Sequence, residues 1–244
     1  MRKISELALQ TGVDIPFSSA RVTIHNPKMY EIAMIGEEHF HLGTYFLNFS
    51  KDRLLSQDKS NLDNQSDFEI FMSVMNSPQG AKHKIDALMV LALLFPQHKI
   101  KIEKEQILLQ LENFSSSINK LNFDEFKYII QEMFCLNLST DADGQAYNPQ
   151  DGLARKIAEK LSKARQKKNI KEGGKLEIYG KFISILSVGM QKSKKELSQY
   201  TVFQLRDEMD RFNLKENFDM NIKARLAGAK DLEEVDNWMK DLHP

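Results

Sequence analysis

The chain has 244 residues, of which 41% are hydrophobic and 28% are charged, which is the composition of a globular protein and excludes a wholly disordered one. Lys and Arg together number 34, and so do Asp and Glu, so the formal net charge is zero. This balance disfavours a protein whose main task is to coat nucleic acid, because such proteins carry a clear excess of positive charge.

The N-terminal region predicts a short strand followed by two helical segments. Val22 and Ile24 indicate an edge strand. Asn26 and Pro27 have the pattern of a helix start, with Asn as N-cap and Pro in the first helical position. The predicted helix ends at Gly36, a second helical segment continues to about residue 50, and the polar stretch 51–66 indicates a loop.

The middle of the chain predicts three helices and a β-hairpin. Apolar residues in 68–75 indicate a buried helix, and a second helix ends before Pro96. Alternating apolar residues between 98 and 112, with acidic residues near a turn, are typical of a β-hairpin. Asn122 begins another helix. The apolar residues that share one face of this helix are Phe126, Ile129, Ile130, Met133 and Phe134.

A basic segment follows, in which Asn148 and Pro149 again indicate a helix start. Residues 151–175 contain nine Lys or Arg against three Asp or Glu. The candidate contacts to an anion or a nucleic acid are Arg155, Lys156, Lys160, Lys163, Arg165, Lys167 and Lys168. The segment also carries an apolar stripe and no interleaved aromatic residue, so a solvated helix face is the favoured interpretation and nucleic acid is not expected as a partner.

The C-terminal region predicts helices only. A helix covers about 175–190, and Ser193 with Glu196 and Thr201 with Gln204 have the spacing of capping boxes. The second capping box opens the longest predicted helix, which Gly228 ends, and a short helix over 231–243 follows.

Apolar residues on these last helices are candidates for binding another protein. Flexible Met side chains and aromatic rings suit contacts with varied apolar segments, although a core helix has the same pattern. The candidate partner-binding residues are Phe212, Phe218, Met220, Trp238 and Met239.

The chain contains no recognisable catalytic or metal-binding motif. Motifs for phosphate cradles, dinucleotides and nucleophile elbows are absent from the sequence. His39 and His41 lie near Glu37 and Glu38, but the two histidines are at positions i and i+2 of a predicted helix, which places their imidazoles on different sides. We therefore expect no catalytic residue, no metal, no cofactor and no enzymatic activity.

Two features bear on the compartment. Cys135 is the single cysteine and follows an apolar helical stripe, so a buried thiol in a reducing compartment is expected. The longest apolar run, at 87–95, is about half of a membrane span, and the first residues lack the apolar core of a secretion signal. A cytosolic protein without a membrane segment is the simplest interpretation.

Three stretches together are similar to a protein family of tailed bacteriophages that infect Gram-positive hosts. They are IHNPKMYEIAMIGEEHF, YNPQDGLARKIAEKLSKARQK, and the C-terminal stretch from LSQYTVFQLRDEMDRF to ARLAGAKDLEEVDNWMKDLH. The family is associated with tail genes and is tail assembly chaperone-like. The resemblance implies a non-enzymatic protein in the cytoplasm of the infected host, which binds the helical tape measure protein and helps to recruit tail-tube subunits.

These observations lead to a definite expectation. The fold is mainly α with a small β-hairpin (α+β) and helical bundle-like packing, with an N-terminal unit at 1–145 and a C-terminal helical unit at 146–244. The function is phage tail assembly through protein–protein contacts, and a homo-oligomer is compatible with it. The alternatives are a structural component of the virion, in the connector, tail or baseplate, and a nucleic-acid-binding accessory factor.

Overall fold

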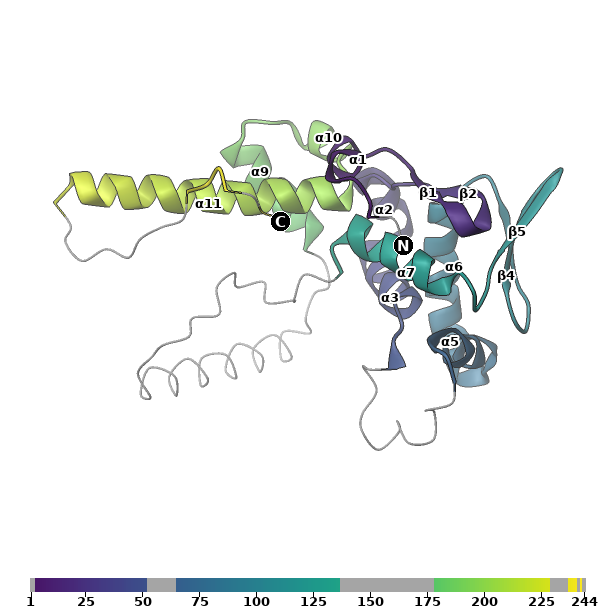
Figure 1. Cartoon of the computed structure of the whole chain (residues 1–244). Helices are drawn as coiled ribbons and strands as arrows, with labels where there is room; N and C mark the ends of the chain where they lie inside the picture. Colours follow the sequence, from purple (N-terminus) through teal and green to yellow (C-terminus); the bar gives the residue numbers. More distant parts are fainter. Residues whose placement is uncertain (1–2, 52–64, 137–177, 229–236, 241, 243–244) are drawn as a thin grey trace, which may run out of the picture.

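A computed structural model describes residues 3–51, 65–136, 178–228, 237–240 and 242, and Figure 1 shows the arrangement of its elements. Its helices are α1 (Glu6–Thr11), α2 (Met29–Ile35), α3 (Glu37–Leu47), α5 (Asp67–Asn76), α6 (Ala81–Leu94), α7 (Phe123–Phe134), α9 (Tyr179–Gly189), α10 (Lys194–Leu197) and α11 (Val202–Leu226). Its strands are β1 (Ile15–Phe17), β2 (Val22–Ile24), β3 (Lys99–Ile102), β4 (Ile107–Leu111) and β5 (Phe114–Ile118), and its short 3-10 turns are η1 (Ser18–Ala20) and η3 (Pro78–Gly80). The predicted α+β class, mainly helical, is confirmed.

The predicted hairpin is present, but it forms two strands of a three-stranded antiparallel sheet in the order β3-β4-β5. Ile102 lies opposite Ile107, and Ile107 lies opposite Ile118 on the far side. These positions face the core, since Ile107 and Ile118 are fully buried. The third strand was missed because β5 has the sequence FSSSI, in which three serines hide the alternation of polar and apolar residues.

The first twenty-five residues contain more structure than their pattern indicated. The strand predicted at Val22 and Ile24 is confirmed as β2, and it pairs with β1 so that Ile15 lies opposite Ile24. The carboxylate of Glu125 on α7 accepts hydrogen bonds from the backbone N–H groups of Ser18 and Ser19, at 3.2 and 3.3 Å. The turn between the two strands is therefore held by a distant helix, which no local pattern could predict.

The helix start predicted at Asn26 is wrong, because the N-cap of α2 is Lys28, two residues later, and the helix begins at Met29. The backbone N–H of Asn26 donates to Asp14 Oδ1 at 3.0 Å, and that of His25 donates to the Leu94 carbonyl at 2.9 Å. These contacts keep the chain extended past the proline. The Glu31 carboxylate accepts a hydrogen bond from the backbone N–H of Lys28 at 2.7 Å. This bond gives a partner to the N-cap N–H group at the observed start of the helix.

Helices α3 and α6 make close backbone contact at a glycine. A Cβ atom added at Gly43 would lie 2.4 Å from the backbone oxygen of Asp86, so only glycine fits at this crossing. The Asp86 side chain is buried, and its Oδ1 lies 2.7 Å from His39 Nδ1. This packing fixes the position of α6 against the body.

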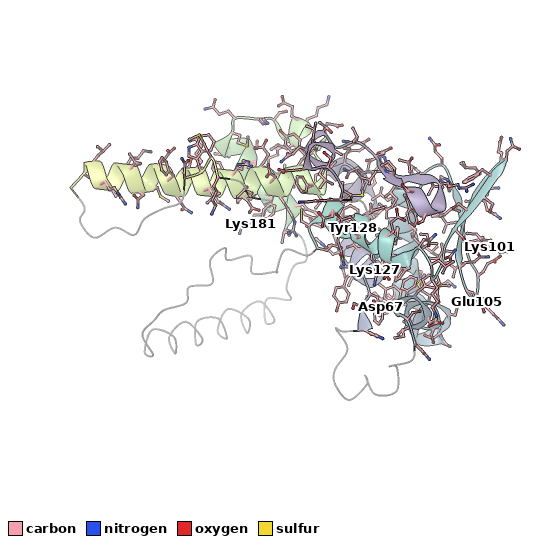
Figure 2. The ribbon with its side chains drawn as sticks, in the orientation of Figure 1. Asp67, Lys101, Glu105, Lys127, Tyr128 and Lys181 are labelled. Atoms are coloured by element: carbon pink, nitrogen blue, oxygen red, sulfur yellow. The ribbon has the colours of Figure 1, made fainter. Side chains whose placement is uncertain are left out.

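Helices α5 and α7 pack through aromatic rings. The ring of Phe123 on α7 lies 5.1 Å from that of Phe68 and 5.2 Å from that of Phe71, measured between centroids. Beside them, Lys127 Nζ lies 2.6 Å from Asp67 Oδ2, and Figure 2 shows the two side chains close together. Partial burial disfavours the charged carboxylate, but hydrogen bonds from the Lys127 side chain and the Lys51 backbone outweigh it, so the pKa of Asp67 is lowered.

The helix at Asn122 and the position of Cys135 agree with the sequence. The five apolar residues predicted to share one face of α7 are all buried. Cys135 follows directly and is itself buried, and burial raises the pKa of its thiol to about 12. The predicted structural role of this cysteine is confirmed.

The described C-terminal helices share one hydrophobic core with the N-terminal elements. The backbone N–H groups of Met29 and Tyr30 donate to the carbonyls of Tyr200 and Ser198, at 2.9 and 3.0 Å. Glu37 Oε1 accepts from the backbone N–H groups of Ile178 and Tyr179, and so caps the start of α9. The domain boundary predicted between 145 and 146 lies outside the described residues.

Candidate protein interface on helix α11

Helix α11 consists of two halves that differ in burial. Its buried residues are Val202, Phe203, Leu205, Asp207 and Met209. No residue from Asp210 to Leu226 is buried. Figure 1 shows that this part extends away from the body of the molecule. We call Val202–Met209 the anchored half and Asp210–Leu226 the projecting half.

The anchored half is fixed at its first turn. The predicted capping box is confirmed, because the Thr201 side chain accepts from the Gln204 N–H at 3.3 Å and Gln204 Oε1 accepts from the Thr201 N–H at 2.8 Å. The Gln204 side chain also donates to the Gln10 carbonyl at 2.6 Å. Lys28 and Thr201 also form an isolated antiparallel β-bridge. The direction of the helix is set by this bridge together with the capping box and the contact of Gln204 with Gln10.

Phe212 lies where the two halves meet. A Cβ atom added at Gly189, the last residue of α9, would lie 2.3 Å from Phe212 Cε2. The ring therefore rests directly on the α9 backbone, and it is half-buried. Of the residues predicted to bind a partner, Phe212 is the one that this structure places against the chain's own core.

The projecting half carries a second apolar stripe, formed by Leu214, Phe218, Ile222 and Leu226. A spacing of four residues advances about 40° beyond a full turn, so the stripe winds slowly around the helix. Measured around the axis from the core residue Leu205, the stripe begins about 180° away at Leu214, passes roughly 140° away at Phe218 and ends about 60° away at Leu226. Exposure rises along it, to 41% at Ile222 and 83% at Leu226.

The predicted residue Met220 is 57% exposed but lies on another side of the helix. Around the axis it lies at least about 120° from each of the four residues of the stripe. Met220 is therefore not part of the winding stripe. As a partner-binding residue Met220 stays a prediction, and Leu214 joins the stripe through the spacing of four residues.

The C-terminal residues return to the middle of α11. Arg211 Nη1 donates to the Lys240 carbonyl at 3.3 Å, and residues 237–240 form a turn there. Trp238 is half-buried and Met239 is 66% exposed. The described part of the predicted final helix is thus a turn, in which the Met239 N–H donates to the Asn237 side chain. Residues 229–236 of that prediction lie outside the described ranges.

Charges on the projecting half are mixed in sign. Lys215 Nζ and Asp219 Oδ2 lie 2.9 Å apart, four residues from each other on the helix. The hydrogen bond from Lys215 lowers the pKa of Asp219, and the same bond raises the pKa of Lys215. Such pairs keep an exposed helix soluble, and alternating signs give no field that would attract a polyanion.

The basic residues predicted as an anion or nucleic-acid site, from Arg155 to Lys168, lie outside the described residues. That interpretation stays a prediction.

The two imidazoles that the sequence places near Glu37 and Glu38 have separate partners. His39 faces Asp86, whereas His41 Nε2 lies 3.3 Å from Glu37 Oε1 and its ring stacks on Tyr179 at 5.0 Å between centroids. Partial burial disfavours the charged form of Glu37, but hydrogen bonds from His41 and from the α9 backbone outweigh it, and the pKa of Glu37 is lowered. Within the described ranges, no three His, Cys, Asp or Glu side chains gather as a metal site would require.

Across the described part of the chain, none of the helices combines the length and the apolar character needed to cross a bilayer.

Residues 167–243 match the model of a family described as the YomV second domain. This is a phage-associated family, with proteins like YomV of Bacillus phage SPBc2, and the match is consistent with a phage protein. It covers about a third of the chain and includes α9, α10 and the whole of α11, which carries the candidate interface. No curated protein and no solved structure matches the chain.

Proposed function

We propose that the chain is a non-enzymatic phage tail assembly protein of the chaperone-like kind. In this proposal the projecting half of α11 binds an apolar helical segment of the tape measure protein in the cytoplasm of the infected bacterium. The observation that carries the proposal is the winding stripe of Leu214, Phe218, Ile222 and Leu226. Among the described residues, none of these four side chains belongs to the hydrophobic core or packs against it.

The physical argument starts from the cost of exposed apolar surface. Leu226 and Ile222 lie on a helix that the body holds rigidly at its other end, so they cannot turn inward to the core. A row of apolar side chains kept in water is typical of a site for another protein. A tape measure protein is long and helical, and its own apolar stripes would aggregate without a cover.

The geometry of the stripe indicates what kind of segment it would bind. Its thirteen residues span about 20 Å along the helix, which matches three to four turns of a partner helix. An amphipathic helix laid against it would contact residues spaced three and four apart, as in other helix-in-groove complexes. The mixed charges beside the stripe, such as Lys215 and Asp219, would then border the contact on its polar side.

Co-expression tests the proposal. The full chain is produced together with the tape measure protein encoded in the same phage genome, and the soluble fraction of the tape measure protein is measured. We expect the wild-type chain to raise that fraction several-fold and the double variant Phe218→Lys/Ile222→Lys to lose the effect. An unchanged fraction with the wild-type chain would rule out the proposed partner.

A matched control distinguishes the loss of the interface from the general effect of adding a positive charge to the surface. Leu121 is 94% exposed and lies before α7, far from α11 along the chain, so Leu121→Lys changes the surface in the same way elsewhere. This variant should keep the solubilising effect. Circular dichroism of both variants should match the wild type, which shows that a loss of effect is not a loss of fold.

A further inference from the structure

Helix α6 is apolar on its outer side as well as on its inner side. Its inner residues Ala87, Val90, Leu91 and Leu94 are fully buried in the core. On the outer side Ile85 is 55% and Met89 36% exposed, and Leu88 is only half-buried. Residues 87–94 of this helix are all apolar, and a helix that is apolar all round is normally enclosed on all sides. The outer face of α6 therefore lacks a partner in the described chain.

The outer residues form a regular seam. Ala81, Ile85, Leu88 and Ala92 are spaced by four, three and four residues, which is the spacing of a coiled-coil contact line. Ala81 and Ala92 are both exposed. The seam is symmetric about a point between Asp86 and Ala87, with small residues at both ends and large ones in the centre.

This symmetry fits a second copy of the same helix in antiparallel orientation. A twofold axis through the midpoint brings Ala81 against Ala92 of the other copy, and Ile85 against Leu88. The alanines let the helix ends approach closely, and the larger side chains fill the centre. A contact between identical patches of this kind is the commonest arrangement in soluble homodimers.

The charges of α6 favour the same orientation. Its first turn contains no acidic residue and its last turn no basic one, while Lys82 and Lys84 lie near its N-terminus. These charges oppose the helix dipole, whose positive end is the N-terminus. In the antiparallel pair Lys82 lies beside the C-terminal end of the other α6, where a cation is favourable. The two copies of Lys82 are then about 14 Å apart along the axis, so they do not repel each other at contact distance.

We infer that the chain forms a twofold homodimer through the outer face of α6, with the two α6 helices antiparallel. The contact is confined to one helix from each copy, so the dimer dissociates on dilution, as small interfaces do. It is independent of the tape measure interface, because α6 and the projecting half of α11 share no residue.

Sedimentation velocity over a range of concentrations tests the dimer. The wild-type chain should change from monomer to dimer as the concentration rises. Ile85→Lys places two charges in the centre of the seam and should leave a monomer at every concentration. Leu121→Lys, a matched control outside α6, should dimerise like the wild type. A wild-type chain that stays monomeric, or an Ile85→Lys variant that still dimerises, would overturn the inference.

Cysteine cross-linking tests the orientation. Ala81→Cys and Ala92→Cys are made separately in the full chain, where the native Cys135 is buried. A mixture of the two variants should give a disulfide-linked dimer under mild oxidation, because residue 81 meets residue 92 of the other copy. Neither variant alone should cross-link, since identical positions are about 16 Å apart along the axis. Cross-linking of either variant by itself, or none in the mixture, would contradict the antiparallel seam.

Discussion

The two halves of α11 have similar apolar content but opposite environments. In the anchored half, Val202, Leu205 and Met209 recur at intervals of three and four residues, stay on one side of the helix and are buried. In the projecting half, a constant interval of four makes the stripe wind around the helix, from the side opposite Leu205 at Leu214 back toward it at Leu226. One unbroken helix can thus serve as a core element at one end and as an interface at the other, and the change in interval marks where the role changes.

Truncation of a leucine in each half should separate the two roles most strongly. Leu205→Ala removes a fully buried side chain and should lower the free energy of unfolding by about 2–5 kcal/mol. Leu226→Ala, at a site that is 83% exposed, should leave it nearly unchanged. Urea unfolding of the two variants measures the difference. Equal losses would show that the projecting half is part of the folded core.

The contact of Glu37 with α9 supports the anchored half indirectly, because α9 packs against α11. Glu37→Ala leaves the N–H groups of Ile178 and Tyr179 without their acceptor, and should cost about 1–3 kcal/mol in urea unfolding. Leu7→Ala, at a site that is 70% exposed on α1, is a control that should cost far less. A Glu37→Ala variant as stable as the wild type would exclude this carboxylate as an anchor.

Acid should weaken the same contact. The folded-state pKa of Glu37 is lower than the ordinary value of 4.5, so the unfolded chain binds more protons in this range. The contribution of Glu37 is therefore present above about pH 4.5 and is lost as the pH falls through the lower folded-state value. Urea unfolding at pH 7 and pH 4 should show a smaller acid-induced loss for Glu37→Ala than for the wild type. Identical losses would argue against the lowered pKa.

The capping box at the start of α11 should have a smaller effect. Thr201→Ala removes the side-chain acceptor for the Gln204 N–H and should cost about 1 kcal/mol. Thr201→Ser keeps the hydroxyl group and should recover most of that loss. The difference between the two urea midpoints isolates the cap from the loss of the methyl group, and no difference would mean that the cap is not a determinant of stability.

The ion pair on the projecting half should contribute least. Lys215 and Asp219 are solvent-exposed, and water and salt screen such pairs. Lys215→Ala should therefore leave the urea midpoint unchanged within error. A clear loss of stability would mean that the projecting half has contacts that hold it in place.

Most of the helices could be predicted from the sequence because their signals are local. The capping boxes at Ser193 and Thr201 and the apolar face of α7 each depend on residues within one or two turns. Asn26 shows the limit of this reasoning: its Asn-Pro pattern is typical of a helix start, yet contacts from Asp14 and Leu94 hold the chain extended. Tertiary hydrogen bonds outweighed a local preference there.

The interface could be predicted only in part. Phe212 and Phe218 were both identified as apolar residues of a long helix, but the sequence could not show that Gly189 leaves room for the Phe212 ring on α9. The exposed seam of α6 was missed for a related reason. The apolar residues of α6 predict burial, and only the packed structure reveals that Ile85 faces solvent.

Hydrogen exchange of the individual α11 amides tests whether the projecting half is the binding surface. In the free protein, amides of the anchored half should exchange slowly and those of residues 213–226 quickly. In a purified complex with the tape measure protein, residues 213–226 should become protected while the anchored half stays as it was. If 213–226 are already protected in the free protein, or remain unprotected in the complex, the projecting half of α11 is not the binding surface.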